Sequence, residues 1–172
     1  MNKAEIDRLL RKTSLGDNAA FEMLYLKTRR GVFAFIHTYL GVYADTDDVM
    51  QTVYLKIKTG IASYRWGTNG SAWILQIAKN CALNELKKRK QTLSIDDVEI
   101  VDNKNAFESS SVMEVMEEVL SEEERRVVTL HVLWGYKHRE IARILECPTG
   151  TITSKYKRAI EKLKQSLKEV EE

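Results

Sequence analysis

Residues 146–159 read ECPTGTITSKYKRA, and this stretch carries the strongest helix-breaking signal in the chain. It contains Pro148, the only proline of the 172 residues, and Gly150 follows two positions later. Proline is tolerated in the first turn of a helix, where its missing N–H costs little and its fixed φ suits the helix. The stretch therefore predicts a tight turn, with one helix ending before it and another beginning at the proline.

Apolar residues recur with helical spacing on both sides of this turn. The preceding segment, KHREIARIL at residues 137–145, predicts a short helix with Ile141, Ile144 and Leu145 turned inward. After the turn, the core stripe of a longer helix consists of Ile152, Tyr156, Ile160, Leu163 and Leu167. Two helices joined in this way, the second rich in Lys, Arg, Ser and Thr, predict a helix-turn-helix.

The second helix of this motif has a polar and basic face beside its core stripe. The residues that we expect to contact DNA on it are Thr151, Thr153, Ser154, Lys155, Lys157 and Arg158. Such a face can enter the major groove and offer donors to base edges and phosphates. A solvated basic helix has the same composition, but the preceding turn and short helix favour DNA binding.

The rest of the chain also predicts helices and shows no strand pattern. The amphipathic helices expected nearer the N-terminus lie at residues 3–14, 19–40, 46–59 and 72–90. Asp17 is the expected cap of the second of these, and Asp45 or Thr46 that of the third. Ser121 and Glu124 have the spacing of a capping box, which predicts the start of a further helix.

Charge divides the chain into three blocks. Lys and Arg outnumber Asp and Glu by 15 to 8 in residues 1–90 and by 11 to 6 in residues 125–172. Residues 91–124, by contrast, contain 1 Lys or Arg and 11 Asp or Glu. Residues 91–111 also lose the helical period, which indicates a linker, with a surface loop inside one domain as the alternative. We therefore expect an all-α fold with two small helical domains, 1–90 and 112–172, joined by an acidic flexible linker.

Composition and motifs exclude several classes of protein. No apolar run is long enough to span a membrane, and the N-terminus lacks a secretory signal, so we expect a cytoplasmic protein without membrane insertion. Cys81 and Cys147 lack CxxC spacing, which argues against disulfides and zinc. The chain has no GxxxxGK[ST], GxGxxG or HExxH motif, and its three histidines are scattered, so we expect neither an enzyme nor a cofactor.

The first domain carries two further surfaces. A polar stripe on its last helix ends in a basic cluster and contains Gln76, Asn80, Asn84, Lys87 and Lys88. The loop before that helix offers Tyr64, Arg65 and Trp66, and aromatic side chains beside an Asn/Lys face suit unstacked bases. Core burial is the alternative for Trp66. Asp47, Asp48 and Gln51 form an acidic face that fits either a protein partner or plain solvation.

Two segments together resemble the bacterial extracytoplasmic-function (ECF) sigma factors, small members of the sigma-70 family. DTDDVMQTVYLKI (residues 45–57), followed by SAWILQIAKNCALNELKKRK (71–90), resembles their region 2. LSEEERRVVTLHVLWGYKHREIARILECPTGTITSKYKRAIEKLKQSL (120–167) resembles their region 4. The resemblance implies a factor that binds core RNA polymerase, with region 2 melting and reading the minus-ten element and region 4 reading the minus-thirty-five element.

The resemblance also assigns roles to single residues. Docking to the largest polymerase subunit is implied for Asp47, Asp48, Gln51 and Thr52. Capture of a flipped base falls to the loop that contains Tyr64, Arg65, Trp66 and Asn69. Contacts with the melted strand or the duplex edge fall to Asn80, Asn84, Lys87 and Lys88. The linker would run through the polymerase, and an anti-sigma factor is a further expected partner.

The chain departs from the family pattern at a few positions, which bears on promoter preference. Asn84 stands where an acidic residue is usual, and Thr153 and Lys155 stand where arginine is frequent. Trp134 stands where glutamate is frequent, and an exposed tryptophan there could contact polymerase or an anti-sigma factor. The alternative function is a stand-alone helix-turn-helix regulator, which explains residues 121–168 but leaves the acidic face, the aromatic loop and the linker without a purpose.

Overall fold

The computed structural model describes residues 2–92 and 111–171, and every regular element in these two ranges is helical. The chain divides into two compact units, residues 1–103 and 104–172. Residues 93–110, most of the expected linker, lie outside the described residues, so the linker stays a prediction. The all-α fold expected from the sequence is confirmed.

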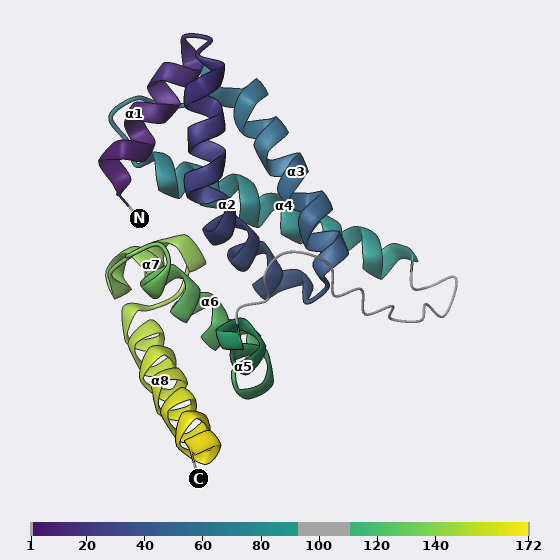
Figure 1. Cartoon of the computed structure of the whole chain (residues 1–172), viewed down its shortest axis with the longest axis vertical. Coiled ribbons are helices and arrows are strands. Elements are labelled where there is room, and N and C mark those ends of the chain that lie inside the picture. The colour runs from purple at the N-terminus through teal and green to yellow at the C-terminus, as the bar shows by residue number, and fades with distance from the viewer. Residues whose placement is uncertain (1, 93–110, 172) are drawn as a thin grey trace. The chain divides into compact units, whose positions relative to one another are not determined.

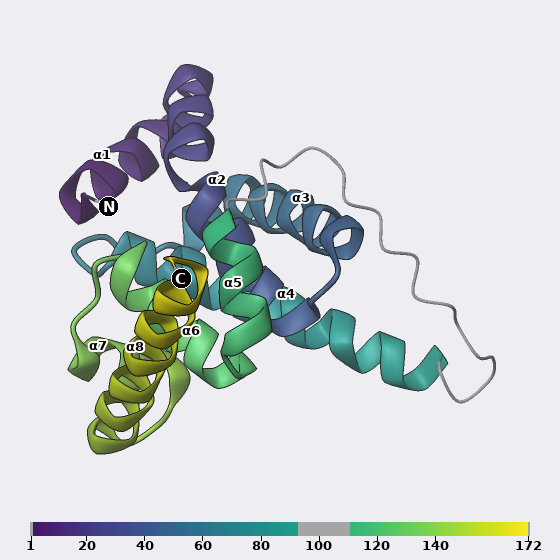
Figure 2. The same cartoon turned by 60° about the horizontal axis from the view of Figure 1, so that its bottom comes forward.

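The first unit consists of α1 (Lys3–Ser14), α2 (Asn18–Leu40), α3 (Tyr43–Gly60), the short 3-10 helix η1 (Ile61–Ser63) and α4 (Gly70–Thr92). Helix α1 packs against α2 and α4, and α2 packs against α3 and α4 (Figure 1). Helix α3 runs beside α4, which creates the surface discussed below (Figure 2).

The interior of the first unit comes from the apolar stripes of its four long helices. Leu24 of α2, Val53 and Ile57 of α3, and Ile74 and Ala78 of α4 are all fully buried. Removal of this much apolar surface from water stabilises the unit, at roughly 25 cal/mol per Å² buried. The helix faces that remain outside are therefore free to bind partners.

The ends of the helices test the capping predictions. Asp17 caps α2 as expected, because its Oδ1 accepts a hydrogen bond from Ala20 N at 2.9 Å. The prediction that Asp45 or Thr46 caps α3 is wrong, since α3 begins at Tyr43. Thr46 is fully buried instead; its hydroxyl donates back to Val42 O at 2.7 Å and lies 3.1 Å from His37 Nδ1.

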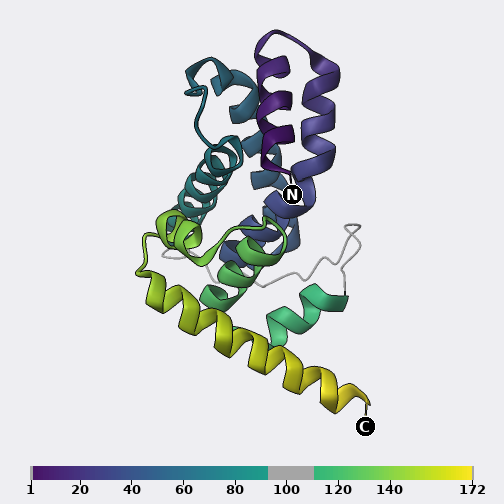
Figure 3. The ribbon, with the colours of Figure 1, turned by 90° about the vertical axis from the view of Figure 1, so that its left-hand side faces the viewer.

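The second unit consists of α5 (Ser111–Val119), α6 (Glu122–Val132), α7 (His138–Leu145) and α8 (Thr149–Glu171). Figure 3 shows the long helix α8, which packs against each of the other three. One apolar cluster joins α8 to α5 and α6 and consists of Met116, Leu120, Val128, Tyr156, Ala159 and Leu163. One side of α8 therefore packs against the rest of the unit, and the opposite side is exposed.

The helix-turn-helix predicted from the proline is confirmed. Helix α7 ends at Leu145; the next residue, Glu146, has a φ of 56° in the left-handed region, and Cys147 N closes the turn on Ala142 O at 2.9 Å. Pro148 precedes the first residue of α8, Thr149.

Trp134 is buried, since only 1% of this residue is accessible to solvent, so the condition for its contact with polymerase or an anti-sigma factor is not met. Helix α6 ends at Val132, and the turn at Gly135, with φ 69°, is followed by Tyr136, whose N–H donates to Leu130 O at 3.1 Å. This bond ties Tyr136 to the last part of α6, and both Trp134 and Tyr136 are buried. The large apolar side chains exposed here are those of Val132 and Leu133.

Candidate nucleic-acid interface

The open side of α8 is the first candidate surface. Ser154, Lys157 and Arg158 are exposed on it, together with Gly150, while Thr151 is half-buried. The Ser154 hydroxyl donates to Gly150 O at 3.0 Å, which leaves its oxygen able to accept a further hydrogen bond. Gly150 and Thr151 lie in the first turn of α8, where free N–H groups favour phosphate, and Ser154, Lys157 and Arg158 follow in the next two turns.

Thr153 lies on a different side of α8 from Ser154. Its hydroxyl donates to Thr149 O at 3.0 Å and lies 3.1 Å from His138 Nδ1 of α7. His138 and His131 both pack on the Tyr156 ring, with centroids 5.1 Å and 4.6 Å from it. Burial and the neighbouring His131 lower the pKa of His138. Thr153 therefore joins the two helices of the motif, and its expected contact with DNA stays a prediction.

Carboxylates from the start of α6 neutralise part of the basic face of α8. Lys155 Nζ lies 2.7 Å from Glu123 Oε2, and Lys162 Nζ lies 2.8 Å from Glu124 Oε2. Arg158 Nε is 3.7 Å from Glu124 Oε1. The hydrogen bond and charge of Lys155 lower the pKa of Glu123. The basic face that remains open is consequently narrower than the sequence predicted.

In the first unit, α4 presents the predicted polar stripe. Gln76, Asn80, Asn84 and Lys87 are all exposed, and Gln76 Nε2 donates to Asn80 Oδ1 at 3.1 Å. Leu83 lies among them and is 43% exposed. Sequence reasoning missed this leucine, although its spacing of seven residues from Gln76 places it on the same face.

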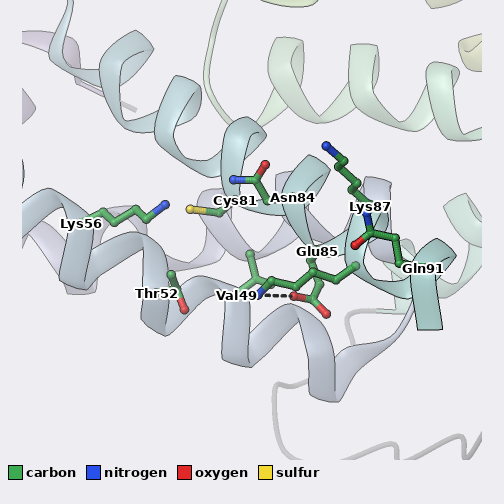
Figure 4. A pocket seen from close by; sticks show the side chains of 9 residues that line it. Val49, Thr52, Lys56, Cys81, Asn84, Glu85, Lys87 and Gln91 are labelled. Carbon is green, nitrogen blue, oxygen red and sulfur yellow. Dashed lines mark ion pairs between the residues drawn. The ribbon is translucent and has the colours of Figure 1, made fainter.

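A groove with a volume of about 380 Å³ lies between α3 and α4. The residues that line it are Val49, Thr52, Lys56, Cys81, Asn84, Glu85, Lys87, Lys88 and Gln91 (Figure 4). Its lining includes Thr52, expected at polymerase, together with Asn84 and Lys87, expected at DNA. Figure 4 shows Lys56 and Cys81 pointing toward each other across the groove. Cys81 is buried, and burial raises the pKa of its thiol.

Arg89 belongs to the basic cluster at residues 87–90, but it makes its contacts within the first unit. Its guanidinium forms an ion pair with Asp45 and donates to Leu40 O at 3.2 Å, so it fastens the end of α4 to the start of α3. Lys87 and Lys88, which precede Arg89, remain exposed, and so does Lys90, which follows it. The contribution of the cluster to a nucleic-acid surface therefore rests on these lysines.

In the loop before α4, Tyr64 was expected to contact an unstacked base, but it is buried. This side chain is only 4% exposed, so its ring is not open to a base. Its hydroxyl lies 3.1 Å from Thr68 O and 3.4 Å from Asp7 Oδ1, and burial raises its pKa. Tyr64 instead packs beneath the loop. Its ring centroid lies 4.9 Å from that of Trp66, in an edge-on arrangement, and 5.1 Å from that of Trp73.

The other loop residues are placed more favourably for a ligand. Trp66 is 46% exposed, so core burial, the alternative for this residue, does not occur, and Arg65 is exposed beside it. Asn69 caps α4, because its Oδ1 accepts from Ala72 N at 3.2 Å and from the Ser71 hydroxyl at 2.7 Å. Its side-chain oxygen is thereby committed to the helix, while contacts of Trp66 and Arg65 with DNA stay predictions.

The acidic face of α3 is exposed along its whole length. Asp47, Asp48, Gln51 and Thr52 are all exposed, and Gln51 Nε2 donates to Asp47 Oδ2 at 3.2 Å. Leu55, one turn further on, is 63% exposed and was missed by sequence reasoning. An apolar side chain beside carboxylates suits a protein partner better than a nucleic acid.

Neither a metal centre nor a membrane span is found in the described parts of the chain. Residues 2–92 and 111–171 contain no group of three or more His, Cys, Asp or Glu side chains placed to hold a metal ion. None of the helices in the same ranges is long and apolar enough to cross a bilayer.

Two family models match the chain, and together they cover more than half of it. The model of sigma-70 region 2 matches residues 24–92, and that of sigma-70 region 4 matches residues 113–163. The chain belongs to the sigma-70 family. It is a sigma factor of the ECF group, and sigma factors are transcription initiation factors rather than enzymes. The stand-alone regulator is not favoured, because the region 2 match covers α3, α4 and most of α2.

Curated relatives and solved structures agree with this assignment. The sigma factor is 29% identical to the ECF RNA polymerase sigma-E factor of Escherichia coli K12, over 89% of either chain. It is 24% identical to the RNA polymerase sigma-H factor of Pseudomonas aeruginosa, over 97% of this chain and 96% of the relative.

Two solved structures show the same fold. One is the sigma factor RpoE of Bartonella quintana in complex with the anti-sigma factor NepR, with a TM-score of 0.66 and 23% identity over 86% of this chain and 96% of that one. The other is CnrH in complex with the cytosolic domain of CnrY, with a TM-score of 0.64 and 18% identity over 95% of this chain and 97% of that one.

Proposed function

We propose that this sigma factor binds core RNA polymerase and directs initiation at promoters, reading the minus-ten element with its first unit and the minus-thirty-five element with its second. The observation that carries the proposal is the pair of exposed polar surfaces, one on α4 with its preceding loop and one on α8, in units that match regions 2 and 4. Because core polymerase acts on the chromosome, the proposal puts the protein in the cytoplasm.

The reading of duplex DNA is proposed for the open side of α8. Ser154, Lys157 and Arg158 follow the turn of the helix-turn-helix and project from the side opposite the apolar cluster. A second helix of this motif lies in the major groove, where arginine and lysine pair with guanine and serine accepts or donates.

The handling of melted DNA is proposed for the exposed loop and stripe of the first unit. Trp66 offers a ring face for a flipped base, supported from below by Tyr64. Asn80, Asn84 and Lys87 offer amide and ammonium donors along one side of α4. Stacking and charge together hold single strands with little dependence on sequence.

Docking to polymerase is proposed for α3. Asp47, Asp48, Gln51 and Thr52 supply a polar and acidic rim, and Leu55 supplies an apolar anchor next to it. Interfaces commonly combine such a buried anchor with a polar rim. Because RpoE of Bartonella quintana, which has the same fold, is bound to the anti-sigma factor NepR, we also propose an anti-sigma factor as a partner.

The test is transcription by purified components. Core polymerase mixed with this chain should give run-off transcripts from a subset of genomic fragments, and core polymerase alone should not. The chain should also be retained by immobilised core polymerase, and Leu55→Asp should abolish both retention and transcripts while leaving α8 able to bind duplex DNA. Absence of transcripts from every fragment, together with absence of core binding, would contradict the proposal and favour the stand-alone regulator.

A further inference from the structure

The first turn of α6 lies against the basic side of α8. It contains three consecutive glutamates, and two of them reach across to the neighbouring helix. Glu123 pairs with Lys155 at 2.7 Å, and Glu124 pairs with Lys162 at 2.8 Å. Glu122 instead pairs with Arg126 of its own helix at 2.8 Å. The same short segment thus has two carboxylates that face α8 and one that does not.

Lys155 differs from the other cations near the start of α8. It lies three residues after Ile152 and four before Ala159, both fully buried, so it stands at the edge of the core stripe. Its side chain is only 13% exposed, whereas that of Arg158 is 61% exposed. Within the described residues, Lys157 has no ion pair at all. Lys155 is therefore directed toward α6, whereas Lys157 and Arg158 are exposed, Arg158 with a longer contact of 3.7 Å to Glu124.

A phosphate contact by Lys155 would require the Glu123 pair to open. The freed carboxylate would then lie next to the phosphate and repel it, because like charges within a Debye length are poorly screened. Glu123 also lies in the first turn of α6, where the helix dipole stabilises a negative charge. Since Lys155 lowers the pKa of Glu123, this carboxylate stays ionised at neutral pH.

We propose that Glu123 is a specificity-determining residue that holds Lys155 away from the DNA backbone. Phosphate contacts raise affinity for every sequence alike, whereas base contacts distinguish sequences. Withdrawal of one lysine therefore lowers binding to arbitrary duplex and leaves recognition to Ser154, Lys157 and Arg158. The inference rests on the proposed role of α8 in binding duplex DNA.

The test compares Glu123→Gln with Glu122→Gln in the full chain. Each substitution removes one negative charge from the first turn of α6, but only the first releases Lys155. Binding to a labelled duplex of scrambled sequence is measured by fluorescence anisotropy over a range of salt concentrations. Glu123→Gln should raise the affinity about threefold and steepen the slope of log K against log salt by about 0.9, the value for one added phosphate contact.

Two further variants test whether the change in affinity and salt slope comes from Lys155. Lys155→Ala alone should leave the salt slope unchanged, and Glu123→Gln combined with Lys155→Ala should lose the gain of the single Glu123 variant. Equal slopes for the unsubstituted chain and for the Glu123 and Glu122 variants would overturn the proposal. So would a slope reduced by about 0.9 in Lys155→Ala alone, since Lys155 would then already contact a phosphate.

The design separates this inference from the proposed function. The salt slope is measured on scrambled duplex, so it reports the Glu123–Lys155 pair whether or not α8 prefers a particular sequence. Preference is measured in parallel with a duplex carrying the upstream element of a promoter that the polymerase complex transcribes. Loss of preference in Glu123→Gln supports the inference, whereas lack of preference in the unsubstituted chain contradicts the promoter-reading role of α8 alone.

Discussion

Gly70 N donates a hydrogen bond of 2.8 Å to Asp7 Oδ1, and this bond fastens α1 to the first residue of α4. The approach is so close that a Cβ at position 70 would lie 2.4 Å from Asp7 Oδ1 and 2.5 Å from Leu10 Cδ1. The loop that presents Trp66 ends at this contact. The position of a surface expected to bind melted DNA thus depends on a helix outside the region 2 match.

We expect Gly70→Ala to destabilise the first unit by about 1–3 kcal/mol, the usual cost of forcing an extra methyl group into a packed site. Urea unfolding followed by circular dichroism measures the change. Gly150→Ala is the matched control, because a Cβ there has open space around it and should not lower stability. Equal effects of the two substitutions would show that the Asp7 contact is not as tight as the structure has it.

Replacement of Trp66 by Ala should weaken binding of a single-stranded minus-ten oligonucleotide to the polymerase complex. The expected loss is about 1–3 kcal/mol, the range for stacking of one base on an aromatic ring. Since nearly half of the side chain is exposed, unfolding of the free chain should change little. Trp66→Phe should keep most of the affinity. Unchanged binding in the alanine variant would exclude the stacking role.

Lys157→Ala should weaken binding of the chain to its upstream element by about 1–3 kcal/mol if the side chain reads a base edge. If Lys157 contacts phosphate instead, the loss should be similar for every duplex and the salt slope should fall by about 0.9. Lys164→Ala, an equal charge change at another exposed position of α8, is the control. The role of Lys157 would be refuted if the two variants behaved alike.

Stability of the second unit should fall when the solution is acidified below about pH 6.5, the ordinary pKa of histidine. Burial and His131 lower the pKa of His138, so in that range the unfolded chain binds a proton that the folded chain does not. The stabilisation is present above the unfolded pKa and is lost as the pH falls. Thr153 and Tyr156 also contact His138.

The measurement is urea unfolding of the unsubstituted chain and of His138→Gln at about pH 7.5 and about pH 5.5, on either side of the histidine pKa. The loss of stability on acidification should be smaller in the variant. Glu123 and Glu124, whose pKa values are lowered, destabilise the unit only at lower pH, below the ordinary value for glutamate. An identical pH dependence in both chains would contradict the role of His138.

Local signals in the sequence predicted the secondary structure well. The turn at Pro148, the capping box at Ser121 and the cap at Asp17 all depend on residues within a few positions of one another, and all are confirmed. The start of α3 was placed wrongly, because Thr46 is drawn into the interior by His37, nine residues away. Propensity and spacing contain no information about such a contact.

The candidate surfaces were harder to predict, because exposure is decided by packing between distant segments. Tyr64 is buried beneath α1 through Asp7, which lies 57 residues away in the chain. Trp134 is buried just after the end of α6, and Lys155 pairs with Glu123 of that helix. In each case the residue type suited the expected role. The missing information was which neighbour the fold supplies.

Glu124 accepts hydrogen bonds both from its own helix and from α8. Its Oε2 accepts from Ser121 N at 3.0 Å, which closes the capping box of α6, and from Lys162 Nζ at 2.8 Å, which binds α8. Burial alone would raise the pKa of Glu124, but the bonds from Lys162 and Ser121 outweigh it and lower the value. One carboxylate oxygen therefore links the start of α6 to the docking of α8. Local opening of the two helices is then a single event, and amide hydrogens at the start of α6 and in the middle of α8 should exchange at a common rate.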